Sequence, residues 1–215
     1  MIISRGRKYI FVHIPKTGGT ALTLALESRA MKDDILIGDT PKAVTRRRRL
    51  KNVQAAGRLW KHSTLADIDG LLRADELDDF LIFTLVRNPW DRMVSYYHWL
   101  RVQSFDHPAV DLARRLEFAA FVADPQTQIA FRGWNYGRYM CDTSGVEHQA
   151  LFIRLEDMTA ELAPLEAHLG FRLDEVAQVN VSDRGRDYRQ YYSEATKELV
   201  ADMCAPDIAR FGYAY

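Results

Sequence analysis

Two adjacent glycines follow a short apolar run near the start of the chain. Residues 8–14 are mostly aromatic or β-branched, which favours a buried strand, and helical spacing of apolar residues begins at about residue 20. Glycines at such a turn let backbone N–H groups approach a ligand, and the helix that begins there adds partial positive charge. This glycine loop (residues 15–20) therefore predicts a site for a phosphate-type anion, served by Lys16, Thr17, Gly18, Gly19 and Thr20.

A second candidate anion site follows the most strongly apolar run of the sequence, residues 80–86. Arg87 comes directly after this run, and Ser95 lies eight residues later, two turns into a helix predicted to end at about residue 102. Arginine recognises phosphate through paired N–H donors, and a serine hydroxyl adds another donor. Arg92 lies one turn before Ser95 and could join them. A nucleotide with phosphates at two positions would explain why one protein carries both sites.

Each pattern also has a purely structural interpretation. The glycines could serve the geometry of the turn alone, with Lys16 as a solvated charge. Arg87 could simply form an ion pair with Asp91, an interaction that is common and weak at surfaces. The glycine loop differs from the Walker A pattern of nucleotide kinases and NTPases because its lysine precedes the glycines, and no aspartate ends the run 81–86. A kinase or NTPase is nevertheless the alternative enzyme.

Strands and helices alternate along the chain, which predicts the α/β class, with a mostly parallel sheet and ligands at the carboxyl ends of its strands. Asn88 suits the N-cap and Pro89 the first position of the helix after Arg87, and Ser63 or Thr64 could cap another. No linker or repeat interrupts the pattern, so one domain over residues 1–215 is expected. The other predicted elements are a strand at 149–155 and helices at 20–30, 64–72, 117–123, 158–169 and 193–203, whereas residues 31–61 give no clear pattern.

The composition limits the kinds of protein that fit. The 215 residues are 47% hydrophobic, which is enough for one substantial core. Lys and Arg together number 29, as do Asp and Glu, so no global field draws the chain to nucleic acid. Cys141 and Cys204 lack metal-ligand spacing, and no metal is expected. No run approaches the roughly 20 apolar residues of a membrane span, so we expect a soluble, cytoplasmic protein without a transmembrane segment.

Both anion-site segments resemble motifs of one enzyme family. Residues 9–20 (YIFVHIPKTGGT) are similar to the 5'-phosphosulfate loop of sulfotransferases that use 3'-phosphoadenosine-5'-phosphosulfate (PAPS), and residues 86–97 (VRNPWDRMVSYY) are similar to their 3'-phosphate motif, in the same order. The resemblance is strongest to the carbohydrate branch, which includes heparan sulfate 2-O- and chondroitin-type enzymes. It implies a P-loop-like three-layer fold with a central, mostly parallel sheet flanked by helices. Golgi members are longer and begin with a membrane anchor that this sequence lacks.

The resemblance assigns roles to individual residues. Lys16 would contact the oxygen that bridges sulfur and the 5'-phosphate, while backbone N–H groups of residues 17–20 hold the other oxygens. The product would be adenosine 3',5'-bisphosphate (PAP). In the family a late loop covers the nucleotide, although a solvated turn explains the late basic residues here equally well. Arg87 and Ser95 would bind the 3'-phosphate, and Arg184 and Arg186 would belong to the covering loop.

An attacking hydroxyl must lose its proton, and histidine has the unperturbed pKa best matched to accepting it near neutrality. We expect His62 to be this base, because it precedes a predicted helix at the place where the catalytic histidine of the family falls. His98, one turn past Ser95, is the second candidate. His13 lies within the first predicted strand and is expected to be a buried histidine that orients the glycine loop.

The basic run Arg46–Arg49 could bind an anionic acceptor, although charge runs are usually solvated. The expected partner is a hydroxyl-bearing acceptor, a glycan or glycolipid, and not nucleic acid. A non-catalytic polyanion-binding module built around this run is the remaining alternative, which the overall neutrality of the chain disfavours. The sequence leaves the identity of the acceptor and the oligomeric state open.

Overall fold

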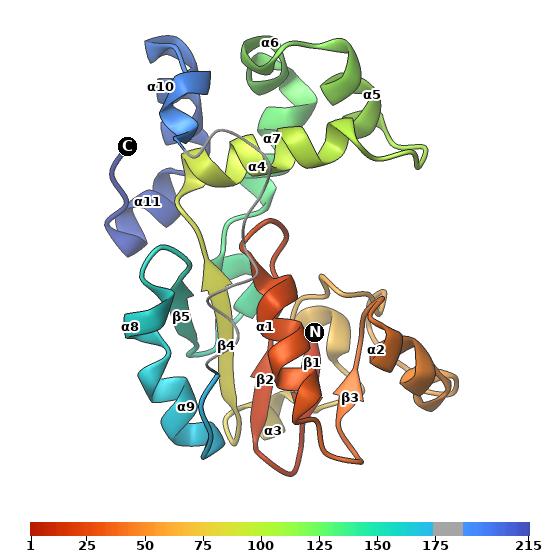
Figure 1. The fold of residues 1–215 in the computed structure, drawn as a ribbon. Coiled ribbons are helices and arrows are strands. Elements are labelled where there is room, and N and C mark those ends of the chain that lie inside the picture. Colours follow the sequence, from red (N-terminus) through yellow and green to blue (C-terminus); the bar gives the residue numbers. More distant parts are fainter. Residues whose placement is uncertain (174–186) are drawn as a thin grey trace. The chain divides into compact units, whose positions relative to one another are not determined.

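The computed structural model describes residues 1–173 and 187–215, which fall into two compact units. Of the described residues, the sheet unit comprises 1–86 and 136–173, and the helical unit comprises 87–135 and 187–215. All the strands described belong to the sheet unit (Figure 1). None of the described helices combines the length and the apolar character that crossing a membrane requires.

The sheet unit is built on a five-stranded sheet with the order β3-β1-β2-β4-β5. The strands β2 (Tyr9–Phe11), β4 (Leu81–Val86) and β5 (Leu151–Arg154) are parallel, with Phe11 opposite Phe83 and Val86 opposite Arg154. The edge formed by β1 (Ile2–Ser4) and β3 (Ile35–Leu36) is antiparallel. The predicted α/β class, with a sheet flanked by helices, is confirmed. The parallel strands end at one edge of the sheet, where the glycine loop follows β2.

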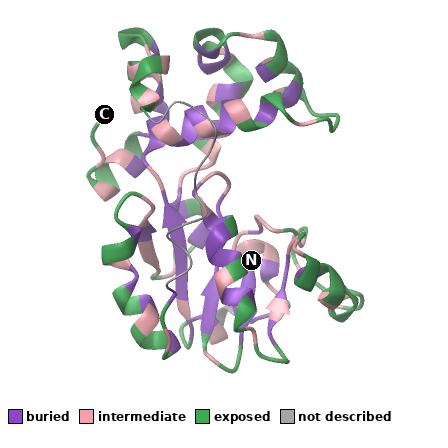
Figure 2. Cartoon of the chain, viewed as in Figure 1, coloured by how far each residue is buried: buried purple, intermediate pink, exposed green. Residues whose placement is uncertain are grey.

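The central strand β4 has the sequence LIFTLV and is buried from its second residue onward, as expected for a strand covered on both faces. Its one polar side chain is satisfied, because the Thr84 hydroxyl donates to the Val12 carbonyl over 2.7 Å. Val12 also donates its backbone N–H to the Phe83 carbonyl over 3.0 Å. The chain after β2 is therefore held beside β4 although the regular strand stops at Phe11. Figure 2 shows the buried interior running along these strands.

Helices pack on the sheet through one apolar cluster. It joins Leu22 and Leu26 of α1 (Gly19–Ser28) and Leu165 of α9 (Ala163–Leu169) to Phe11 and Phe83 of the strands. The helix predicted over 158–169 is present in two pieces, with α8 (Met158–Glu161) before α9. Pro164 lies in the first turn of α9, where the missing N–H costs nothing, and Gly170 ends the helix with a φ of 72°.

The helix predicted over 64–72 is wrong. Only a 3-10 turn, η2 (Ala66–Ile68), forms there. Thr64 and Asp67 bond to each other's backbone N–H groups over 3.2 and 2.7 Å, which favours a local turn. The N–H groups of residues 65 and 66 donate to the carbonyls of residues 139 and 141, so tertiary contacts take backbone donors in this segment. The sheet unit also contains α2 (Pro41–Arg46), η1 (Arg47–Leu50), α3 (Ala74–Leu77) and η3 (Gly137–Met140).

The helical unit is organised around α4 (Pro89–Arg101), the helix predicted to follow Arg87. Asn88 caps it as expected, because its side-chain oxygen accepts the Trp90 N–H at 3.1 Å. The buried face of α4 packs Met93 and Tyr97 into an aromatic core. The other helical elements of this unit are α5 (Pro108–Arg115), α6 (Phe118–Ala123), α7 (Pro125–Gly133), η5 (Tyr188–Tyr191), α10 (Glu194–Met203) and α11 (Ala205–Phe211).

Candidate functional site

The glycine loop has an unusual backbone. Lys16 has a φ of 66° and Gly18 a φ of 83°, so both lie in the left-handed region. Glycine adopts this region freely, whereas for lysine it is uncommon and strained, and such strain collects at binding and catalytic sites. Gly18 is followed directly by the helical Gly19. A left-handed residue followed by a right-handed one turns successive N–H groups toward the same side, which gives the start of α1 a concave geometry suited to an anion.

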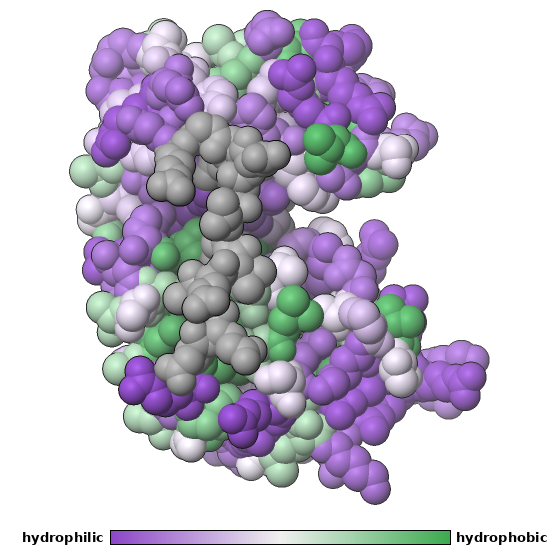
Figure 3. All heavy atoms as spheres, viewed as in Figure 1, coloured by the Kyte–Doolittle hydropathy of each residue, from purple (hydrophilic) through white to green (hydrophobic). Residues whose placement is uncertain are grey.

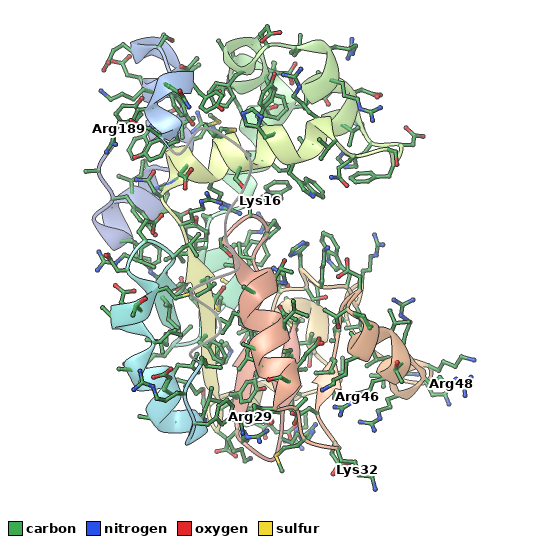
Figure 4. The ribbon with its side chains drawn as sticks, viewed as in Figure 1. Lys16, Arg29, Lys32, Arg46, Arg48 and Arg189 are labelled. Atoms are coloured by element: carbon green, nitrogen blue, oxygen red, sulfur yellow. The ribbon has the colours of Figure 1, made fainter. Side chains whose placement is uncertain are left out.

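Thr17 braces the loop from inside. Its side chain is fully buried, and its hydroxyl donates to the Ile14 carbonyl over 2.9 Å. The hydroxyl proton is therefore engaged within the loop, and the donor that Thr17 offers to an anion is its backbone N–H. Lys16 is partly exposed and Thr20 exposed, as ligand-binding side chains of a loop must be. Figure 4 shows Lys16 at the turn that leads into α1.

His13 packs directly beneath the loop. It is 8% exposed, and its ring stacks on Phe11 with 5.8 Å between centroids. A Cβ atom at Gly19 would lie only 2.4 Å from Cδ2 of His13. The first residue of α1 is therefore glycine where the His13 ring leaves no room for a side chain. Burial, and then the neighbouring His62, lower the pKa of His13 well below its ordinary value.

His62 is tied to the end of the same strand. Its Nδ1 lies 2.7 Å from the carbonyl oxygen of His13. A carbonyl only accepts, so Nδ1 carries the proton and Nε2 of the neutral ring has a free lone pair. Burial lowers the pKa of His62 from 6.5 to about 4, and the bond to His13 partly opposes this shift. The ring is thus neutral at pH 7, which is the state a general base requires.

The second predicted constellation lies at the start of α4. Asp91 and Ser95, four residues apart, share one face of the helix, and Arg87 lies two residues before α4. The Arg87 Nε donates to Asp91 Oδ2 over 2.7 Å, and a terminal nitrogen of Arg87 lies 2.6 Å from the same oxygen. The ion pair foreseen as the structural interpretation is therefore present. Both side chains are mostly buried, at 12% and 18% exposed, and Ser95 is partly exposed.

Arg92 does not join this face, which corrects the expectation that it could. It is 3% exposed, donates to the Trp134 carbonyl over 3.1 Å, and lies over the Phe131 ring. It belongs to the aromatic core of the helical unit. The spacing was misleading because residues three apart on a helix lie about 60° apart in azimuth, enough here to place Arg92 inside and Ser95 at the rim.

Residues 1–214 match the family model described as the sulfotransferase family. The chain belongs to the sulfotransferase family. Among solved structures, it is similar to that of mouse sulfotransferase SULT7A1 complexed with PAP, with 16% sequence identity and a TM-score of 0.46. That match covers 97% of this chain and 88% of the other. No curated protein matches.

In this sulfotransferase the predicted residues fall into two groups. The glycine loop and His62 belong to the sheet unit, joined through the contacts of His13. Arg87 and Ser95 belong to the helical unit, as does His98, whose ring meets Tyr191 edge-on at 4.9 Å. Arg184 and Arg186 lie outside the described residues.

Sequence reasoning missed Trp60. Its ring meets His62 edge-on with 5.0 Å between centroids, and it remains 42% exposed. The guanidinium of Arg58 lies over the same ring. Trp60 therefore packs against the His62 ring, as the His13 ring also does. No sequence pattern singled out this contact, because it depends on the fold of the loop.

The run Arg46–Arg49 belongs to a larger basic surface of the sulfotransferase. Arg46 donates to the Met31 carbonyl over 2.8 Å, and Arg49 donates to the Lys32 carbonyl. Bonds to carbonyls anchor these guanidinium groups without neutralising them. Figure 3 shows mostly hydrophilic side chains over α2 and the turn after it. Figure 4 shows Arg29, Lys32 and Arg46 around the C-terminal end of α1 and Arg48 farther out, beyond α2. The name basic surface denotes the exposed or partly exposed basic residues between positions 29 and 51, which are Arg29, Lys32, Lys42, Arg46, Arg47, Arg48, Arg49 and Lys51.

Proposed function

We propose that this sulfotransferase moves the sulfuryl group of PAPS to a hydroxyl of its acceptor and releases PAP. The observation that carries the proposal is the strained left-handed backbone at Lys16 in a loop that enters α1. A lysine held there keeps its charge beside a set of backbone N–H donors, as an anionic donor substrate requires. The match to the sulfotransferase family supports the same reaction.

The proposed chemistry needs charge stabilisation and a proton acceptor. The acceptor oxygen bonds to sulfur while the bond from sulfur to the bridging phosphate oxygen breaks, which leaves negative charge on the departing PAP. Lys16 and the N–H groups of residues 17–20 stabilise that charge. His62 takes the hydroxyl proton at Nε2. An anion bound nearby would raise the pKa of His62 above its value of about 4, closer to the range in which a base works best.

Arg87 and Ser95 are proposed to hold the 3'-phosphate of the donor. The Asp91 carboxylate, on the same helix face as Ser95, holds the Arg87 guanidinium, and this ion pair would orient Arg87 for binding. A fixed guanidinium presents its paired donors with less loss of conformational freedom on binding. Recognition of a 3'-phosphate distinguishes PAPS from ATP, which has none.

The acceptor is proposed to be an anionic carbohydrate, free or lipid-linked. The basic surface lies around the end of α1 that is opposite the glycine loop, and the ten residues of α1 span about 15 Å. An acceptor that reaches from the basic surface to Lys16 must therefore be a chain of several sugars rather than a small alcohol. Of the acidic residues nearby, Asp34 is buried, Asp39 pairs with Lys61 and Asp33 is exposed, so basic residues outnumber exposed carboxylates on this surface.

A thermal-shift titration with transfer of radiolabelled sulfate tests the proposal. PAP without Mg²⁺ should raise the melting temperature, and labelled PAPS should pass its sulfate to material in saccharide fractions. Stabilisation by Mg-ATP with no response to PAP would instead support a kinase or NTPase and overturn the proposal.

The acceptor class is tested separately with acidic and neutral oligosaccharides of equal length. Replacing Arg47, Arg48 and Arg49 by Gln should raise the KM for acidic acceptors and leave the affinity for PAP unchanged. Equal use of neutral and acidic chains by the wild-type enzyme would remove the charge argument while leaving the reaction intact.

A further inference from the structure

His13 touches both halves of the proposed reaction centre through different parts of the same residue. Its carbonyl oxygen accepts the Nδ1–H of His62 at 2.7 Å, and its ring meets the His62 ring edge-on at 4.9 Å. The same ring occupies the space in which a side chain at Gly19 would stand. One buried residue thus contacts the base and the first residue of α1.

The identity of Gly19 is explained by this contact rather than by its backbone. Gly19 is helical and has no positive φ, unlike Gly18. Alanine would suit such a position better by about 1 kcal/mol, because glycine is a poor helix former. The obstacle is the His13 ring, whose Cδ2 and Nε2 would lie 2.4 and 2.7 Å from an added Cβ. Such distances are far shorter than any real carbon contact.

His13 is itself held firmly. The residue before it, Val12, donates to Phe83 and accepts from the Thr84 hydroxyl, which fixes the chain beside β4. The ring of His13 stacks on Phe11 within the core. Because His13 is fixed beside β4, it also fixes the two groups that it contacts, the start of α1 and His62.

We propose that His13 is a positioning residue that sets the glycine loop and the Nε2 of His62 in one fixed geometry, with Gly19 left bare to receive its ring. The inference rests on the proposed function for its catalytic meaning, but the contact and the tautomer are properties of the protein alone. The carbonyl of His13 selects the tautomer of His62, and the ring keeps His62 from turning away from that carbonyl.

A double-mutant cycle tests the contact. Gly19→Ala and His13→Ala should each reduce kcat by about 100-fold, since small displacements of reacting groups cost that much. The double variant should recover a large part of the Gly19→Ala loss, because the added methyl then occupies the space that the ring has left. Gly133→Ala, in a helix where an added Cβ meets nothing within 4 Å, is the matched control and should behave as the wild type. Additive losses in the double variant would overturn the proposal, since Gly19 would then be required by the ligand.

Nitrogen-15 NMR of His62 gives a test that needs no enzymatic activity. The wild-type protein without substrate should show a neutral ring protonated at Nδ1 and bare at Nε2. In His13→Ala the share of this tautomer should fall, because the ring that held His62 against the carbonyl is gone. The opposite tautomer in the wild type would overturn the inference. PAP binding is measured independently of the NMR experiment. A protein that did not bind PAP would refute the proposed function, whereas the tautomer of His62 would still test the role of His13.

Discussion

The two candidate sites are built in different ways. In the sheet unit, the glycine loop and His62 are joined by contacts between residues far apart in sequence, with a hydrogen bond from His62 to His13 across 49 positions and a lysine in strained backbone. In the helical unit, Asp91 and Ser95 share one face of α4, and Arg87, two residues before that helix, pairs with Asp91. The comparison teaches that the site proposed for chemistry depends on the tertiary fold, whereas the site proposed for recognition depends on local structure. Substitutions should therefore harm the first through turnover and the second through binding.

The largest expected effect is on turnover in Lys16→Ala. Removing a cation from the place where charge develops should lower kcat by about 1,000-fold. PAP affinity, measured by thermal shift, should fall much less. A variant that lost PAP binding and turnover in equal proportion would make Lys16 a recognition residue and erase the contrast between the sites.

His62→Ala should lower kcat by about 100- to 1,000-fold while leaving PAP binding near that of the wild type. Single-turnover transfer from labelled PAPS measures this loss. His98→Ala is the companion variant, because His98 was the second candidate base. Loss of turnover in His98→Ala with full activity in His62→Ala would move the base into the helical unit.

The loss of stability in acid should depend on His62 in the sheet unit. The pKa of His62 is lowered from 6.5 to about 4, so the unfolded chain binds a proton at a higher pH than the folded one. The contribution of His62 to the free energy of unfolding is thus complete above pH 6.5 and is lost as the pH falls toward 4, a change of about 3 kcal/mol. Urea unfolding of His62→Gln should show a smaller loss of stability between pH 7 and 4.5. If the free energy of unfolding fell equally with pH in the two proteins, burial would not lower the pKa of His62.

Arg87→Ala should act mainly on donor binding. A charge-assisted bond to a phosphate is worth about 2 kcal/mol, which corresponds to a 30-fold rise in the Kd for PAP. The rate at saturating PAPS should change little. Adenosine 5'-phosphosulfate, which lacks the 3'-phosphate, provides the control, because its binding should be nearly the same in both proteins.

The smallest expected effect is that of Asn88→Ala, which removes the cap of α4. Such caps are worth about 1 kcal/mol, so the melting temperature should fall by a few degrees while kcat is unchanged. A large loss of PAP affinity would show that the start of α4 takes part in binding beyond positioning Arg87.

Local patterns predicted the elements whose signals lie within a few residues. The apolar run before Arg87 and the Asn-Pro start of α4 were each predicted and are each present. The strands β1 and β3 were missed because three and two residues are too few for a periodic signal. The helix expected at 64–72 does not form, because the backbone of this segment bonds to distant residues and Thr64 and Asp67 stabilise a local turn.

The sequence by itself determined the two candidate anion-binding motifs, the α/β class and the residues proposed to act, because these depend on residue type and short spacing. The tertiary structure alone decided that Lys16 is left-handed, that Arg92 faces a core, and that His62 bonds to His13. It also decided that Gly19 must stay bare. The reason is that backbone strain, burial and tautomer depend on which distant groups occupy the surrounding space, and no pattern of neighbouring residues specifies them.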